Sequence, residues 1–338
     1  MPAISSFLWS NTVTSWILQW SHGQGSVEAS GAMLAPVTFI LPDGRQVQPF
    51  AVFPWAQEAL PPGQPPLTGL MANGRGEWPC VPFGGGPAPF DHPIHGWPAH
   101  GVWQRLDDGG DLAHVHLRYD FPADSPVESV ERLITGVDGQ AEIRCRLKVT
   151  VRRACALPLG LHPTLRLPKR PGALRVTAGA FAFGLTLPRE HEPGADVLQP
   201  DAQFAALSHV PGAGGQPLDL SHLPLAQDTE SLVQLCGVDG QMTVSNLDEG
   251  YAFALAWDAE VLPSCLLWIS NGGRQAWPWS GRHFALGVEP VCSYFDWGVD
   301  AGTKPNPVST RGVATCVQLE PGQPLDIAYQ MTVGGLTL

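Results

Sequence analysis

The sequence predicts an all-β protein that forms a large antiparallel β-sandwich. The first observation is alternation: from Ala141 to Val151, apolar side chains take every second position and polar ones fill the rest, as in a strand with one buried face. The second is the abundance of turn residues, because 38 glycines and 34 prolines interrupt an apolar chain of 338 residues. The third is that no stretch keeps a 3.6-residue period with a cap at both ends. Many strands in at least two packed sheets are therefore expected.

Further strands are expected wherever the alternation or an apolar run recurs. Weaker alternation predicts strands within 112–119, 129–136 and 317–333, and continuous apolar runs predict strands buried on both faces at 33–41, 251–257 and 265–269. Turn residues at 42–44, 107–109, 137–139, 238–240 and 320–322 are expected to join strands tightly. Short helical turns are expected near 55–60 and 201–208. No composition shift or repeat divides the chain, which predicts a single domain over residues 1–338.

Charge and cysteine content exclude several classes of function. The 31 acidic and 19 basic residues give a net charge of −12, which disfavours nucleic acid, anionic membrane surfaces and polyphosphate ligands. The seven cysteines contain no C-x-x-C pair, so neither a disulfide framework nor a thiolate zinc site is expected, and Cys145 and Cys265 are predicted core residues. No basic stretch precedes an apolar run at the start of the sequence, and the apolar run 16–20 is too short to span a bilayer. A cytoplasmic protein is expected.

Three short segments carry the residues that are suited to chemistry. They are His95-Gly96 with Trp103 downstream, Leu161-His162-Pro163 and Gly287-Val288-Glu289-Pro290. A carboxyl group with an ordinary pKa of about 4.3 and an imidazole with one of about 6.5 can act as a base and an acid near neutral pH. Glu289 follows an apolar run and is expected at a strand end, pointing into a cleft. Such a pair suits a neutral, hydroxyl-rich substrate and requires no cofactor or metal.

In their order along the chain, these segments resemble the galactose mutarotase-like superfamily, which includes the aldose 1-epimerases. The resemblance spans about residues 25–333 and rests on Gly31-Ala32, His95-Gly96, His162-Pro163, Glu289-Pro290 and the segment 319–322. It implies a β-sandwich of the supersandwich type with an open, aromatic-lined concave face. It also implies an enzyme that interconverts the α and β anomers of a free hexose or a related neutral sugar.

The resemblance further implies roles for individual residues. Glu289 would be the general base and His162 the general acid, facing each other across a gap the width of a monosaccharide. His95 would bind an oxygen near the sugar ring, and Asp228 would bind sugar hydroxyls. Family members usually carry an Asn-Arg pair before the His-Gly motif. Here the stretch 81–86 has no arginine, and Arg75 is the nearest substitute.

Several alternatives remain open at this point. Trp97 and Trp268 are candidates to stack on the sugar, although packing in the core would explain either one. A metal cluster of His92, His95 and His100 is disfavoured because no carboxylate pattern accompanies it. Arg274 and Arg282, which flank Trp277-Pro278-Trp279, are candidates to reach a substrate hydroxyl, although both are expected to be surface residues. A non-catalytic sugar-binding protein and a sugar-phosphate epimerase are the competing functions, and the scarcity of Lys and Arg weighs against the second. A glycosidase is disfavoured because no convincing pair of carboxylates is present. A monomer or homodimer with a small-molecule sugar as its partner is expected.

Overall fold

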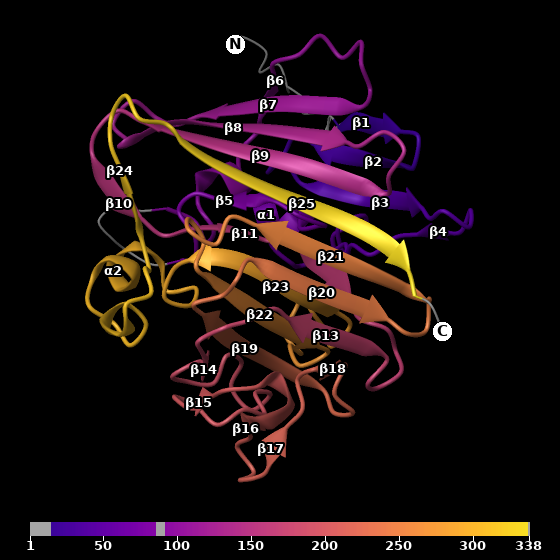
Figure 1. Ribbon diagram of the computed structural model, residues 1–338, viewed down its shortest axis with the longest axis vertical. Helices are drawn as coiled ribbons and strands as arrows, with labels where there is room; N and C mark the ends of the chain where they lie inside the picture. Colours follow the sequence, from indigo (N-terminus) through magenta and orange to yellow (C-terminus); the bar gives the residue numbers. More distant parts are fainter. Residues whose placement is uncertain (1–14, 86–91, 337–338) are drawn as a thin grey trace, which may run out of the picture.

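Two large antiparallel sheets form the body of the protein (Figure 1). The structure is a computed structural model that describes residues 15–85 and 92–336. The first residues of the chain lie outside these ranges. They are the residues in which no basic stretch was found before an apolar run. Within the described ranges, helix is confined to two short segments, α1 (Gly69–Asn73) and α2 (Gly298–Thr303), and three 3-10 turns at Trp97–Ala99, Leu207–His209 and Ser309–Arg311. The predicted all-β class is confirmed.

The nine-stranded sheet forms one layer. Its spatial order is β18 (His222–Leu223), β13 (Leu174–Ala178), β20 (Gln241–Asn246), β21 (Tyr251–Trp257), β25 (Leu325–Gly335), β9 (Glu142–Val151), β8 (Val127–Gly136), β7 (His114–Asp120) and β6 (Gln104–Arg105). The alternation that predicted a strand at 141–151 is confirmed in β9, where buried and more exposed positions alternate from Cys145 onward. One face of this sheet therefore packs on the core.

The eight-stranded sheet forms the second layer and carries the residues of the candidate site. Its order is β15 (Gln203–Phe204), β14 (Phe183–Thr186), β19 (Thr229–Cys236), β22 (Ser264–Asn271), β23 (Phe284–Cys292), β11 (Leu159–Leu161) and β5 (Pro79–Cys80), with β12 (Thr164–Arg166) also paired to β23. Every residue of β19 and β22 is buried. Both faces of the central strands are therefore covered.

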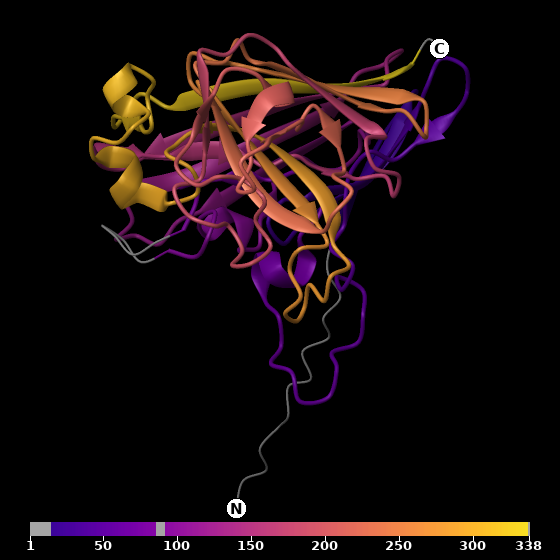
Figure 2. The same ribbon diagram turned by 90° about the horizontal axis from the view of Figure 1, so that it is seen from below.

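Smaller sheets complete the structure, as the two views in Figures 1 and 2 show. They consist of β1 (Ser15–Trp20), β2 (Gly23–Glu28), β3 (Leu34–Ile40) and β4 (Gln46–Val47), of β10 (Cys155–Leu157) with β24 (Val317–Leu319), and of β16 (Val210–Pro211) with β17 (Pro217–Leu218). Among the described residues, no helix is long and apolar enough to cross a membrane.

The space between the two large sheets is filled by one apolar cluster. Val233, Leu267 and Val288 reach it from the eight-stranded sheet, and Val244 and Phe253 reach it from the nine-stranded sheet. The predicted core cysteines, Cys145 and Cys265, are both buried in it. Because side chains alternate along a strand, the intervening residues of β19, β22 and β23 point to the opposite face of the eight-stranded sheet.

Several local expectations were wrong. The strands at 33–41 and 251–257 alternate between buried and less buried positions, so only the run at 265–269 is buried on both faces. The turns at 238–240 and 320–322 join strands that do not pair, since β19 and β20 belong to different sheets, as do β24 and β25. The segment 55–60 forms turns without a helix, whereas the short helical turn expected near 201–208 is present as the 3-10 turn Leu207–His209.

Candidate active site

A pocket lies on the face of the eight-stranded sheet that points away from the shared core. Leu232 of β19, Leu266 and Trp268 of β22, and Glu289 of β23 line it. The strand register makes these residues neighbours, because Leu266 is paired with Glu289 and Trp268 with Leu232. The rigid centre of a sheet thus holds the chemical groups, which fixes their geometry better than loops would.

Glu289 lies in the interior of β23 and not at a strand end as expected. Its carboxylate folds back over Gly287, which lies two positions earlier on the same face of the strand. A Cβ atom at Gly287 would lie 2.3 Å from Glu289 Oε1 and 3.1 Å from Trp268 Cβ. Glycine at this position therefore creates the space in which the carboxylate lies.

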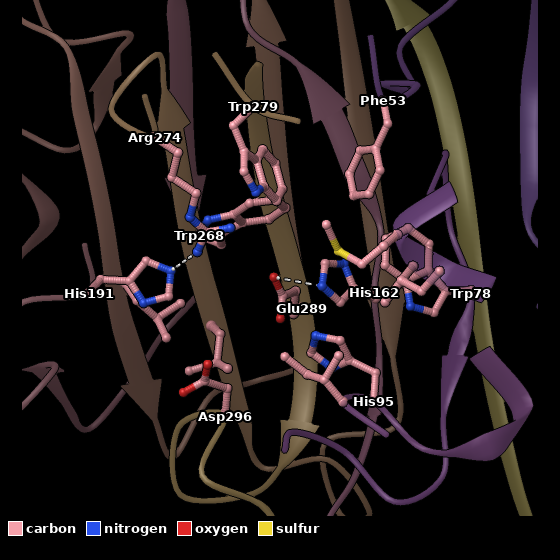
Figure 3. Close-up of a pocket in the computed structure, with 15 residues that line it drawn as sticks. Phe53, Trp78, His95, His162, His191, Trp268, Arg274, Trp279, Glu289 and Asp296 are labelled. Atoms are coloured by element: carbon pink, nitrogen blue, oxygen red, sulfur yellow. Dashed lines mark hydrogen bonds and ion pairs between the residues drawn. The ribbon is translucent and has the colours of Figure 1, made fainter. Parts of the chain in front are cut away.

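His162 directly contacts Glu289. The two atoms His162 Nε2 and Glu289 Oε1 are 3.4 Å apart, and the side chains are 5% and 4% exposed (Figure 3). This distance is longer than a well-formed hydrogen bond, but it is narrower than the monosaccharide-wide gap that was expected. The two residues share one side of the pocket, so a ligand would meet both groups at the same end.

Several contacts orient the His162 ring. Its backbone N–H donates to Trp78 O at 2.9 Å, and the Trp78 ring stacks on the imidazole with centroids 4.1 Å apart and planes at 19°. The Nδ1 atom lies 3.1 Å from Thr164 Oγ1, whose own proton points to His162 O at 3.4 Å. Nδ1 therefore carries the proton and donates to Thr164, which leaves the Nε2 lone pair directed at Glu289.

Burial shifts both groups toward their neutral forms. Burial raises the pKa of Glu289 well above its usual value, and the nearby charge of Asp296 adds to the effect. Burial lowers the pKa of His162 well below its usual value, with a smaller contribution from His95. The neutral pair, in which the carboxyl group holds the proton, is thus the favoured state of the empty pocket.

His95 packs against the edge of His162 in the same pocket. The ring centroids are 4.8 Å apart at 86°, and burial lowers the pKa of His95 to about 3. His95 has φ +62°, and a Cβ on Gly96 would lie 2.2 Å from Val81 O. The His-Gly motif thus forms a tight turn that presents the imidazole. No group of three or more potential ligands that could hold a metal ion occurs in residues 15–85 and 92–336.

Arg274 lines the pocket, so the expectation that it is a surface residue was wrong. Its guanidinium carbon lies 4.6 Å from the Trp279 ring centroid and 5.6 Å from that of Trp268. Its Nη2 atom lies 3.0 Å from Nε2 of His191 (Figure 3). Its Nε atom lies 3.4 Å from a carboxylate oxygen of Glu230. The same carboxylate oxygen accepts a hydrogen bond from Trp268 Nε1 at 2.5 Å, so Arg274 and Trp268 form one connected wall.

Three of the residues expected to bind the substrate do not line this pocket. Arg75 donates to Asn73 O at 2.8 Å and pairs with Glu28 at 3.4 Å. Asp228 is exposed immediately before β19, and Trp97 is 43% exposed beside a different hollow. The pocket instead contains His191, Arg274 and Asp296. Of these, only Arg274 had a sequence signal, its closeness to the Trp277-Pro278-Trp279 segment.

The chain has the fold of solved galactose mutarotase-like structures. A candidate aldose 1-epimerase from Escherichia coli K12 matches with a TM-score of 0.65 and 16% identity over 96% of this chain and 100% of that one. The GalM/aldose epimerase homologue of C. elegans matches at 0.60 and 12% identity over 96% and 100%. A galactose mutarotase-like protein of Lactobacillus casei matches at 0.58 and 12% identity over 95% and 100%. No family model and no curated protein matches the sequence. At these identities the likeness establishes the fold.

Proposed function

We propose that this protein, with its galactose mutarotase-like fold, is an aldose 1-epimerase that interconverts the α and β anomers of a free hexose or related neutral sugar. The observation that carries the proposal is the buried contact of 3.4 Å between His162 Nε2 and Glu289 Oε1 in an aromatic-lined pocket. The names of the matched structures from E. coli and C. elegans support the same reaction class.

The proposed reaction moves two protons, one on each of the two oxygens that are bonded to C1. Ring opening removes a proton from the hydroxyl on C1 and delivers one to the ring oxygen, while the bond between C1 and the ring oxygen breaks and a carbonyl forms. After rotation about the C1–C2 bond, the reverse transfers close the ring on the other face. Both oxygens are bonded to C1, so their proton acceptor and donor must lie close together. A separation of 3.4 Å between the two groups meets this requirement.

One proton shared by the pair is enough for this cycle. With Glu289 ionised and His162 protonated, Glu289 accepts the hydroxyl proton and His162 donates to the ring oxygen. The pair then becomes neutral, which is the state that burial favours in the empty pocket. Ring closure returns both protons and restores the ionic state. The two macroscopic pKa values therefore belong to the pair and not to either residue.

The walls of the pocket suit the faces and edges of a sugar ring. Trp268 and Trp279 offer aromatic surface to apolar C–H groups. Arg274 offers guanidinium N–H donors to hydroxyls, and its contacts with Glu230 and His191 hold it in place. In this proposal Arg274, from the loop between β22 and β23, donates hydrogen bonds to the sugar. Arg75 had been expected to take this role in place of the arginine that the stretch 81–86 lacks.

Polarimetry on α-glucose and α-galactose tests the function. Glu289→Gln and His162→Ala should each lower the enzyme-catalysed rate about 10²–10⁴-fold, because each removes one partner of the proton transfer. Glu260→Gln and His222→Ala, at exposed positions, are the matched controls and should leave the rate unchanged. Equal rates in all four variants and the parent would refute the assignment. Heat of sugar binding without accelerated rotation change would instead indicate a non-catalytic sugar-binding protein.

A further inference from the structure

The pocket contains a second carboxylate that the proposed proton transfer does not use. Asp296 follows β23 and lines the same pocket as Glu289. Figure 3 shows it on the far side of Glu289 from His162. Its Oδ1 atom is buried, and no hydrogen-bond partner for it exists among residues 15–85 and 92–336. No sequence motif indicated this pair of carboxylates, because only the turn after β23 brings Asp296 to the pocket that Glu289 lines.

The backbone around Asp296 is fixed from several sides. Gln234 of β19 accepts from the Phe295 N–H at 2.8 Å and donates to Ser293 O at 2.8 Å. Gly85 N donates to Asp296 O at 2.9 Å. A Cβ on Gly84 would lie 2.5 Å from that same oxygen, so the two segments approach too closely for any larger residue. Phe295 itself has φ +44°, a strained conformation that persists only where its surroundings enforce it.

An unpaired buried carboxylate oxygen is unfavourable unless something donates to it. Burial raises the pKa of Asp296, while a hydrogen bond from its own backbone N–H and the charges of Arg189 and Arg274 act in the opposite direction. Arg274 is the cationic side chain on the pocket wall, but Glu230 and Glu192 hold it at 3.4 and 3.5 Å. Asp296 Oδ1 therefore remains available to a donor that enters from solvent.

We propose that Asp296 is a substrate-binding residue that accepts a hydrogen bond from a hydroxyl or ammonium group of the sugar, away from C1. This inference rests on the proposed function. It also predicts the substrate class: neutral hexoses and amino sugars are accepted, whereas uronates and sugar phosphates are excluded. An anionic sugar would face the Asp296 carboxylate across a pocket of low dielectric, where like charges repel strongly. Glu289 and His162 share one proton and together carry no net charge.

Steady-state mutarotation of glucose, glucosamine, glucuronate and glucose 6-phosphate tests the inference. Asp296→Ala should raise KM for glucose and glucosamine about tenfold to a hundredfold, the usual effect of losing a hydrogen bond to a charged group, with kcat within about threefold of the parent. Asp296→Asn keeps the shape and removes the charge, so it should reduce the preference for glucose over glucuronate about tenfold or more. Asp138→Asn, in the exposed turn between β8 and β9, should behave as the parent.

The outcomes separate this inference from the function on which it rests. If the parent accelerates mutarotation but Asp296→Ala leaves KM unchanged, or if the parent prefers glucose 6-phosphate to glucose, the role of Asp296 is refuted while the function stands. If the parent accelerates no sugar, the proposed function fails. Calorimetry with methyl glucoside then decides on Asp296: weaker binding by both Asp296 variants, with unchanged melting temperatures, supports the role, and equal binding refutes it.

Discussion

Replacing Gly287 with alanine should displace the Glu289 carboxylate without removing it. The new Cβ atom would lie 2.3 Å from Glu289 Oε1, whereas ordinary contacts begin near 3.4 Å, so the carboxylate must move by about 1 Å. A displacement of that size at a reacting group costs about 10²-fold in rate. The clash involves the mobile end of a side chain, and we therefore expect a loss of at most about 1–3 kcal/mol in the free energy of unfolding. Polarimetry and urea denaturation measure the two effects.

A second strand glycine provides the matched control for this variant. Gly334 lies in β25, and a Cβ there would meet no atom within 4 Å. Gly334→Ala should therefore keep the parental rate and stability. If Gly287→Ala retains the full rate and its crystal structure shows a displaced carboxylate, the placement of Glu289 does not control the reaction, and the acid–base proposal loses its geometric basis.

Two further predictions concern pH. Burial lowers the pKa of His162 and raises that of Glu289, so the pair should hold one proton over a wide pH range. A plot of kcat against pH should therefore show no inflection at the ordinary imidazole pKa of about 6.5. A fall in kcat on the acid side, centred at that pH, would contradict the burial argument. The second prediction concerns His283, which is buried and has a pKa lowered to about 3 by burial and by Arg274. The unfolded chain binds a proton below about pH 6.5 and the native chain does not, so His283 makes the protein less stable as pH falls. From pH 7 to pH 5, the parent should lose about 2 kcal/mol of unfolding free energy relative to His283→Phe, as measured by urea denaturation. If the stabilities of the parent and the variant instead change in parallel with pH, the buried imidazole is protonated in the native state.

The sequence predicted the sheet architecture well because alternation is a local signal. β7, β8 and β9 were each found from their own residues, and Asp-Gly segments at 107–109 and 137–139 join strands that do pair. The turn at 238–240 has the same composition, yet it connects β19 and β20 in different sheets. Pairing partners depend on the packing of the whole chain, which a turn sequence does not encode.

The site was predictable only where a motif fixes the backbone. His95, His162 and Glu289 lie beside glycine or proline, and the structure brings all three to one pocket together with Trp268. Asp228 was chosen by approximate position alone, and its exposed side chain lies outside the pocket. His191 and Asp296 both come from loops, and the course of the Asp296 loop depends on distant contacts, such as the hydrogen bonds of Ser293 and Phe295 with Gln234. Local sequence contains no information about those contacts.

The stretch before the His-Gly motif lacks the expected arginine, yet a guanidinium group still lines the pocket. The position of Arg274 gives a physical reason for this. A guanidinium group can reach a sugar hydroxyl from any wall, provided that its side chain is held in place. Here Glu230 and the rings of Trp268 and Trp279 hold it. The proposed acid–base pair lacks this freedom, because Glu289 needs the space above Gly287 and His162 needs Thr164 and Trp78 to orient its ring. A loop residue can therefore be replaced from another wall of the pocket, whereas Glu289 on β23 and His162, between β11 and β12, depend on contacts that their own positions along the chain provide.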